Sequence, residues 1–498
     1  MILKNFPDKD KFCKFADTHN VIPLCIEILA DTETPVSLFK KFYNKKGPFF
    51  LLESVEGGER WGRYSFLGTS ARAHISVYRD FVEIKEAGEI KKIDHKGDPL
   101  NILKDIMDQY NPVEMPELPR FWGGMTGYLT YEMVSFFEKI SNNLPETTPL
   151  AHFIIPEELL IFDNIKNTIT GVVLCFMEDG LDAASVYHAA KTKITAMKKT
   201  IGEKIPNNEK AVNNSVLKPE PVCSEETFKS NVDKVKDYIH KGDIIQAVIS
   251  QPFKCEAPAD LVELYRAQRY INPSPYLYFM HLGDVALVGS SPEVMVRLEN
   301  GVASVRPIAG TRPRGKNEQE DRKLADELLN DEKEKAEHLM LVDLGRNDLG
   351  RVAETGTVQV TDLMVVERYS HVMHLVSNVN CDIKPEYDAF DLLKATFPAG
   401  TLSGAPKIRA MEIIAELEDE PRGPYGGAVG YFSFNGNMDL AITIRTACIE
   451  NNRLTVRAGA GIVADSVPES ERQETINKAK SIEKALALLS NDIIIREE

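Results

Sequence analysis

The pattern of apolar and polar positions predicts short strands in the first two hundred residues. The expected strands include FFLLES (49–54), HISVYRD (74–80) and LLIF (159–162). Between residues 182 and 199, apolar positions recur among polar ones at the spacing of a surface helix. This part of the chain therefore favours sheets with helices packed on them.

The pattern becomes clearer after residue 222. Apolar residues from Phe228 to Ile239 recur at helical spacing behind Ser224, which can cap that helix. Gly242 ends the helix, and IIQAVIS (244–250) follows as an expected strand. We expect further helices at about 258–271, 318–340, 386–396, 404–418 and 468–489.

Expected strands in this second part come in pairs across short turn signals. These are Gly283-Asp284, Asn300-Gly301, Asn435-Gly436 and Asn451-Asn452. Hairpins placed between helices differ from alternating βαβ units. The sequence therefore predicts an α+β fold with largely antiparallel sheets packed by helices.

One stretch interrupts this pattern. Residues 201–222 read IGEKIPNNEKAVNNSVLKPEPV, which is rich in Asn and Pro and poor in apolar residues, as is typical of a linker. We therefore expect two domains, 1–200 and 223–498, joined by this linker.

Composition narrows the classes of function. The chain has 498 residues, is 43% hydrophobic and carries a formal charge of −16, from 75 Asp and Glu against 59 Lys and Arg. That acidity disfavours nucleic acid and anionic membranes as partners. No apolar run reaches transmembrane length, and the 7 dispersed cysteines are typical of reduced cytosolic protein. We expect a cytoplasmic, soluble protein.

Two pairs of glutamates could bind a metal ion. Glu334 and Glu337 lie three apart on one expected helix, and Glu471 and Glu474 do so on another. If the two helix faces met, the carboxylates would suit Mg²⁺, which prefers oxygen ligands. Spacing alone leaves open that both faces are simply solvated.

Three other features have competing interpretations. Arg445, in an expected apolar strand, could bind a substrate carboxylate or pair with an internal acid. His374 could be catalytic or a hydrogen-bonded core residue. Residues 459–464 fit the GxGxxG/A pattern, but Pro468 follows too soon for the helix of a dinucleotide site; their bare backbone could instead approach another ligand.

Taken together, the motifs resemble those of the chorismate-utilising enzymes. The resemblance covers nearly all of residues 224–488 and is carried, in the order of that family, by IIQAVISQ, NPSPYLYF, GSSPE, PIAGTRPRG, EHLMLVDLGRND, GTLSGAPKIRAMEII, YGGAVGY, IRTA, AGAGIVADSVPESE and ETINKAK. Two earlier segments, LLES at 51–54 and GRYSFLG at 62–68, are similar to the N-terminal part of the anthranilate synthase large subunits.

The resemblance implies an enzyme that aminates chorismate at ring carbon 2 and then eliminates pyruvate, giving anthranilate for tryptophan synthesis. It implies that Glu293 is the general acid, that His374 serves the elimination and that Thr401 lines the ring. The implied metal is Mg²⁺, bound directly by Glu337 and Glu474 and through water by Glu334 and Glu471. The implied substrate contacts come from Gly310, Thr311, Tyr425, Arg445, Gly459, Ala460, Gly461 and Lys478.

Two positions indicate the branch of the family. Members that add water carry a lysine at the position of Gln246, and glutamine cannot deprotonate water. Aminodeoxychorismate synthases, of the folate branch, usually carry a lysine at the position of Ala309. Both residues favour anthranilate formation. The alternatives are the folate-branch reaction and a tryptophan-binding sensor without catalytic activity.

The resemblance also implies partners and regulation. The chain has no GxCxG elbow of a glutaminase, so ammonia is expected from a glutamine amidotransferase subunit, in a heterotetramer of two large and two small subunits. L-tryptophan is expected to inhibit by binding Leu52, Glu53, Ser54, Pro275, Tyr276 and Leu277, with Leu277 in place of the usual methionine. The other interpretation is that these segments only pack the two domains together.

Overall fold

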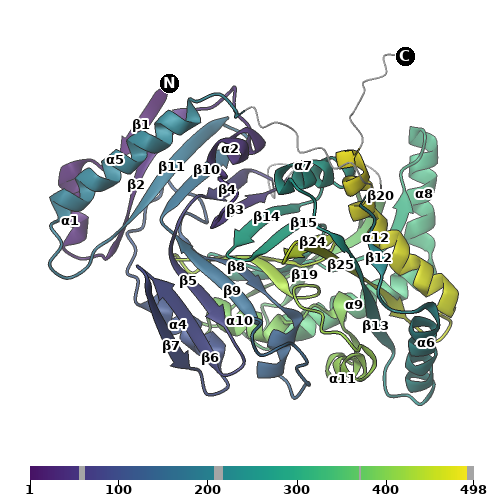
Figure 1. The fold of residues 1–498 in the computed structure, drawn as a ribbon. Helices are drawn as coiled ribbons and strands as arrows, with labels where there is room; N and C mark the ends of the chain where they lie inside the picture. The colour runs from purple at the N-terminus through teal and green to yellow at the C-terminus, as the bar shows by residue number, and fades with distance from the viewer. Residues whose placement is uncertain (55–61, 207–216, 370–371, 491–498) are drawn as a thin grey trace, which may run out of the picture.

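The computed structural model describes residues 1–54, 62–206, 217–369 and 372–490, which fold around two large, mostly antiparallel sheets (Figure 1). None of the helices in these residues is long and apolar enough to cross a membrane. The predicted α+β fold with antiparallel sheets is confirmed.

The first sheet has 13 strands among the described residues, taken from both halves of the chain. In spatial order its strands are β1 (Ile2–Phe6), β2 (Val21–Leu29), β11 (Thr168–Phe176), β10 (Glu158–Asp163), β4 (Tyr64–Gly68), β3 (Phe49–Glu53), β14 (Tyr276–Leu282), β15 (Val285–Ser291), β24 (Thr446–Glu450), β25 (Arg453–Ile462), β13 (Gln246–Glu256) and β12 (Glu220–Pro221), with β21 (Gly404–Ala405) also pairing with β13.

The second sheet has 12 strands within the described ranges. Its order is β18 (Ile308–Pro313), β20 (Val372–Asp382), β17 (Val302–Val305), β16 (Val294–Glu299), β23 (Met438–Ile442), β22 (Ala428–Ser433), β8 (Gly124–Leu129), β9 (Ala151–Pro156), β5 (Ala71–Val77), β6 (Phe81–Glu86) and β7 (Glu89–Asp94), with β19 (Gln359–Arg368) also pairing with β20.

Helices cover the outer faces and ends of the sheets (Figure 1). They are α1 (Lys9–Ala16), α2 (Pro35–Phe42), α4 (Pro99–Asp108), α5 (Ala183–Ile201), α6 (Glu225–His240), α7 (Leu261–Ile271), α8 (Glu318–Asn330), α9 (Glu332–Gly350), α10 (Ala389–Thr396), α11 (Lys407–Leu417) and α12 (Pro468–Ser490), with the short 3-10 helices η1 (Tyr131–Phe136) and η2 (Gly400–Leu402).

Strands from both parts of the chain share each sheet. β3 pairs with β14 in the first sheet, and β8 pairs with β22 in the second. One hydrophobic core runs through both parts and includes Phe50, Phe153 and Phe279. The division at 201–222 stays a prediction about domains, and residues 207–216 of the expected linker lie outside the described residues.

The helix expected at 318–340 is wrong in one respect: it is two helices, α8 and α9. Asp331 lies between them and caps α9, because its carboxylate accepts hydrogen bonds from the backbone of Lys333 at 3.0 Å and Glu334 at 3.2 Å. The split places Glu334 and Glu337 in the first turns of α9.

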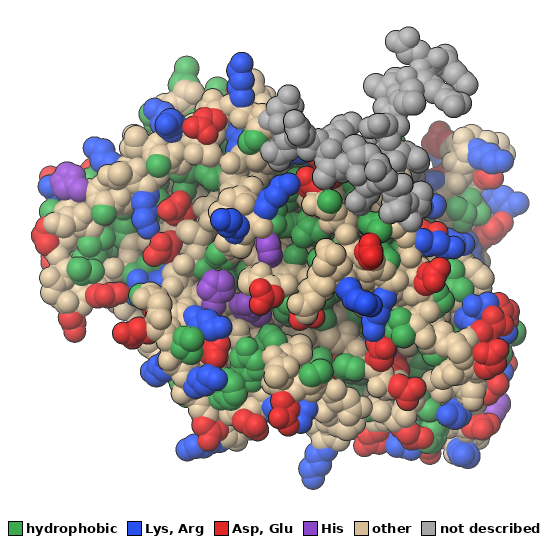
Figure 2. All heavy atoms as spheres, viewed as in Figure 1, with side chains coloured by type: hydrophobic (Ala, Val, Ile, Leu, Met, Phe, Trp, Pro, Cys, Tyr) green, Lys and Arg blue, Asp and Glu red, His purple; other side chains and the backbone are tan. Residues whose placement is uncertain are grey.

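Acidic and basic side chains are interspersed over the face seen in Figure 2. The formal charge of −16 is therefore not concentrated in a single patch on that face. Mixed charges of this kind keep a surface solvated and leave local sites to set their own potential.

Candidate active site

A cavity of about 350 Å³ opens between α9, α12 and the edges of both sheets. We call it the front cavity. Most of the predicted catalytic, substrate and metal residues line it, although they lie far apart in the sequence: Glu293, Thr311, Glu337, His374, Thr401, Tyr425, Arg445, Gly459, Gly461, Glu471, Glu474 and Lys478.

Glu293 contributes a buried carboxyl group to this cavity. It lies between β15 and β16 and is 9% exposed. Burial raises its pKa to about 7, although the Thr401 hydroxyl and the charges of Arg445 and Lys478 oppose that shift. A carboxyl group with this pKa is protonated for part of the time near neutral pH, so it can donate a proton.

His374 is held by the residues next to it on β18. Its Nδ1 atom lies 3.0 Å from the Gly310 carbonyl oxygen and 3.0 Å from the Thr311 hydroxyl. A carbonyl can only accept, so Nδ1 carries the hydrogen, and Nε2 is left as the basic nitrogen. Burial lowers the pKa of His374, which keeps the ring neutral and able to accept a proton.

Arg445 lies between β23 and β24, so its expected place within a strand is wrong. Its backbone is left-handed, with φ of 50°, and its carbonyl accepts a hydrogen bond from Gln268 at 2.7 Å. No Asp or Glu of the described residues is within ion-pairing distance of its guanidinium group, and burial lowers its pKa. This cation is therefore suited to an anionic ligand in the cavity.

The end of β25 brings bare backbone to the cavity. Gly459 and Gly461 line it, while Ala460 points to the opposite face and is 0% exposed, because successive side chains of a strand alternate. A Cβ atom at Gly459 would lie 2.7 Å from the Tyr425 hydroxyl oxygen. Glycine at this point lets the tyrosine and a ligand approach the strand closely.

The carboxylates of α9 and α12 face one another across the cavity. Burial and then the charge of Glu334 raise the pKa of Glu337; the charge of Glu474 acts in the same direction. The pKa of Glu471 is raised by burial, with a further contribution from Glu474. Mutual repulsion of this kind is what a bound cation would relieve.

Two of the four glutamates form ion pairs within the protein. Glu334 pairs with Arg312 at 3.1 Å and lies outside the lining of the cavity, and Glu474 pairs with Lys478 at 2.7 Å. Among the described residues, no three His, Cys, Asp or Glu side chains are close enough to form a complete metal site. The oxygen donors still fit Mg²⁺, which commonly takes one or two carboxylates and completes its shell with water and substrate.

Lys333 is a cavity residue that sequence reasoning missed. It lies one helical turn before Glu337 on α9, and its charge lowers the pKa of Glu337 and Glu471. The i,i+4 spacing to Glu337 could have indicated it, because residues at that spacing share a helix face. Gln246 also lies in the cavity, close enough to Gly461 that a Cβ atom there would meet its side-chain nitrogen at 2.5 Å.

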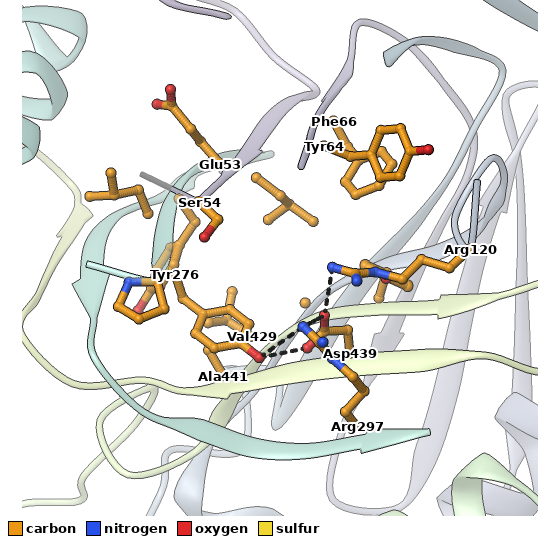
Figure 3. Close-up of a pocket in the computed structure, with 16 residues that line it drawn as sticks. Glu53, Ser54, Tyr64, Phe66, Arg120, Tyr276, Arg297, Val429, Asp439 and Ala441 are labelled. Atoms are coloured by element: carbon orange, nitrogen blue, oxygen red, sulfur yellow. Dashed lines mark hydrogen bonds and ion pairs between the residues drawn. The ribbon is translucent and has the colours of Figure 1, made fainter. Parts of the chain in front are cut away.

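A second pocket, of about 50 Å³, lies between the two sheets, where the end of β3 and the start of β14 face β16, β22 and β23 (Figure 3). We call it the seam pocket. All six residues predicted to bind tryptophan line it: Leu52, Glu53, Ser54, Pro275, Tyr276 and Leu277. The Glu53 carboxylate points away from its centre (Figure 3), where it pairs with Arg269 at 2.8 Å and accepts a hydrogen bond from Tyr265 at 2.7 Å.

The base of the seam pocket is a buried charge network that the sequence did not indicate. Asp439 accepts hydrogen bonds from Tyr276 at 2.9 Å and Arg297 at 2.6 Å, and it pairs with Arg120 at 3.4 Å (Figure 3). Tyr276 belongs to the first sheet, whereas Asp439 and Arg297 belong to the second. The network therefore ties the two sheets together directly below the pocket.

Comparison with known proteins relates this geometry to a family. Residues 48–484 match the family described as chorismate binding enzyme. The chain is 47% identical to anthranilate synthase component 1 of Aquifex aeolicus, over 95% of this chain and 96% of that one. It is 45% identical to the protein of the same name from Pseudomonas aeruginosa, over 98% and 100% of the two chains.

Solved structures agree on the fold. The crystal structure of anthranilate synthase component I from Streptococcus pneumoniae matches with a TM-score of 0.75 and 39% identity, over 92% of this chain and 98% of that one. The menaquinone-specific isochorismate synthase MenF of Escherichia coli matches with a TM-score of 0.71 over 96% and 98% of the two chains. At 19% identity that match speaks for the fold alone.

Proposed function

The chain belongs to the chorismate binding enzymes and, among them, with anthranilate synthase component 1; we propose that its front cavity aminates chorismate at ring carbon 2 and then eliminates pyruvate. The family resemblance predicted from the motifs is confirmed, and the chain is an enzyme that acts on chorismate. The observation that carries the finer proposal is a buried acid, Glu293, in one cavity with Arg445 and the facing carboxylates.

The proposed binding of chorismate pairs its negative carboxylates with positive groups of the cavity. Chorismate carries two carboxylates, and the Arg445 guanidinium group, which has no carboxylate partner in the described chain, takes the enolpyruvyl carboxylate together with Tyr425. The bare backbone of Gly459 and Gly461 lets that end of the substrate lie close to β25. Thr311 and Thr401 lie along the ring.

The ring carboxylate is directed toward α9 and α12. Glu337 and Glu474 would hold Mg²⁺ there directly, with Glu334 and Glu471 supporting through water. When bound, the cation would neutralise the ring carboxylate and stabilise charge that develops across the conjugated ring.

Amination needs an acid because hydroxide is a poor leaving group. Ammonia attacks carbon 2, and Glu293 gives its proton to the hydroxyl that leaves carbon 4; the raised pKa of Glu293, about 7, supports this role. The Nε2 atom of His374 is placed to accept a proton in the elimination that releases pyruvate and aromatises the ring.

Two residues favour ammonia over water as nucleophile. Gln246 lines the cavity where a water-adding enzyme needs a base, and an amide cannot serve as one. Ala309 also lines the cavity and presents no amine that could compete with ammonia. The folate-branch reaction is the second candidate.

Product analysis tests this choice. The purified chain is incubated with chorismate, Mg²⁺ and an ammonium salt, and products are separated and identified by fluorescence and mass. Anthranilate and pyruvate in equal amounts support the proposal. Accumulation of a non-aromatic aminated chorismate supports the folate-branch alternative, and no product at all supports the sensor.

The ammonia source is proposed to be a separate glutaminase subunit, as the name component 1 of the relatives suggests. A heterotetramer of two large and two small subunits is the proposed assembly. If the isolated chain used glutamine as efficiently as ammonium salts, the proposed partner would be superfluous.

The seam pocket is proposed to bind L-tryptophan as a feedback inhibitor. Ser54, which follows β3, lines the pocket together with Pro275 and Leu277 at the start of β14, and this grouping supports the proposal. Inhibition would work because a ligand between the two sheets favours one arrangement of the sheets over another. The charge network through Asp439 connects the two sheets directly below the pocket, so a ligand there could act on how the sheets meet.

A further inference from the structure

A smaller cavity lies directly behind the front cavity. It has a volume of about 50 Å³, and its walls include Glu293, Leu341, Leu344, Gly345, Asp348 and Thr401. Glu293, Leu341 and Thr401 line both cavities, so the two meet at the acid. We call the smaller one the rear cavity.

The rear cavity has room for water. About 10–15 Å³ of space open to a water-sized probe holds one molecule, and the rear cavity offers about 50 Å³. The ring of chorismate is proposed to lie in the front cavity, on the other side of the same carboxyl group.

The rear cavity also offers polar groups to water. The Thr401 hydroxyl is buried and makes no hydrogen bond of normal geometry among the described residues, although it lies near the Glu293 carboxyl. Asp348, at 7% exposure, pairs with Lys407 at 2.6 Å and supplies a charged wall. Unsatisfied buried hydroxyls of this kind commonly bind ordered water.

We propose that the rear cavity is a water site that receives the hydroxyl leaving carbon 4 of the substrate. The inference rests on the proposed function. The C4–O bond breaks with its electron pair on oxygen, the oxygen takes the proton of Glu293, and water results while the ammonia nitrogen bonds to carbon 2. Glu293 is left as a carboxylate.

The placement of Glu293 gives the physical reason. An oxygen that accepts its proton lies within hydrogen-bonding distance of the carboxyl, and the ring still fills the front cavity at that moment. The rear cavity, lined by the same Glu293 and Thr401, is an adjacent space that the ring does not fill, and the new water can enter it. Moving there takes it away from carbon 4 and prevents its return to the ring.

Leu344 offers a matched pair of variants that close or widen this space. Its side chain packs on Gly400, beside Thr401: a Cβ atom at Gly400 would lie 2.0 Å from Leu344 Cδ2. Leu344→Phe fills the rear cavity and Leu344→Ala enlarges it. Gly345→Ala is a second variant that adds bulk to the wall of the rear cavity; its new Cβ atom would lie 2.9 Å from Val305 Cγ2, so this valine, which also lines the cavity, would have to shift.

The test measures ammonium-dependent turnover of chorismate by each variant, with thermal melting to establish folding. For Leu344→Phe we expect kcat to fall about threefold to tenfold, while the KM for chorismate stays within about twofold. Leu344→Ala should keep kcat within about twofold of the wild type. A general packing defect would instead lower the activity of both.

The outcomes separate this inference from the function on which it rests. If the wild-type chain makes no aminated product, the proposed function fails and the inference falls with it. If the wild type is active and both filling variants keep full kcat, or if Leu344→Ala loses as much as Leu344→Phe, only the rear-cavity inference is overturned.

Discussion

The front cavity and the seam pocket are built in opposite ways. All the lining of the front cavity comes from residues after position 245, and charged groups surround it on several sides. The seam pocket takes its walls from both parts of the chain, from Leu52 to Ala441, and Arg120, Arg297 and Asp439 form one compact charge network at its base. The first arrangement suits chemistry on a held substrate, whereas the second suits a ligand that senses how two sheets meet.

This difference predicts which property of the protein a substitution in each pocket should change. A change in the front cavity should alter turnover and leave the join between the sheets intact. A change in the seam pocket or its network should alter ligand response or stability. Four variants test whether turnover separates in this way from ligand response and stability; they follow in order of decreasing effect.

The largest effect is expected from Glu337→Gln on α9. Removing one carboxylate of the proposed Mg²⁺ site should lower kcat/KM for chorismate by about 10³-fold or more, since stabilisation of transition-state charge is lost. The rate of anthranilate formation, followed by fluorescence, gives kcat/KM for each variant. Glu332→Gln is the control on the same helix, because Glu332 is 88% exposed and pairs only with Lys335; equal losses in both variants would remove the metal assignment.

Glu293 should set the pH dependence of amination. The protonated carboxyl is the active form and its pKa is raised to about 7. At a fixed concentration of free ammonia, kcat/KM should therefore be flat below about pH 7 and fall as the pH rises above it. Glu293→Gln should lower the rate by about 10²- to 10³-fold and abolish that fall. A wild-type profile of kcat/KM that does not fall above about pH 7 would contradict the role of Glu293.

The charge network below the seam pocket should carry stability. Asp439→Asn leaves two arginines at a site where the aspartate is 5% exposed, so the free energy of unfolding should fall by about 3 kcal/mol. Urea denaturation measures it. The matched control is Asp343→Asn, an exposed i,i+3 partner of Arg346, which should change stability by less than about 0.5 kcal/mol. Similar values for the two variants would contradict a network that joins the sheets.

The smallest of these effects is expected at Ser54. Ser54→Ala removes one hydrogen bond to tryptophan and should raise its inhibition constant about tenfold. Each variant's inhibited rate is compared with its own uninhibited rate. The exposed Ser230 on α6 supplies the control, Ser230→Ala. Wild-type inhibition in Ser54→Ala would count against tryptophan in the seam pocket.

Much of the fold could be predicted because local signals decided it. Ser224 caps α6 by accepting a hydrogen bond from Thr227, and the four expected turn signals join β14 to β15, β16 to β17, β22 to β23 and β24 to β25. The split at Asp331 was missed because both flanking segments are strongly charged, good helix formers, so the periodicity continues through the break. The cap decided the boundary.

The site residues also divide into those that the sequence could predict and those that depend on how distant segments pair. Family motifs gave the front-cavity residues, but the motif around Gly459 could not show that Ala460 faces the core until the strand register was known. Arg120 and Asp439 could not be foreseen at all, because nothing local relates residues so distant in sequence. The pairing of β8 with β22, and of β22 with β23, brings those two regions together.

The most direct test of two pockets with two tasks is one crystal structure of the chain grown with Mg²⁺, the products anthranilate and pyruvate, and L-tryptophan. We predict Mg²⁺ between Glu337 and Glu474 with product density in the front cavity, and tryptophan in the seam pocket beside Ser54. Tryptophan in the front cavity, or Mg²⁺ bound away from α9 and α12, would contradict the account.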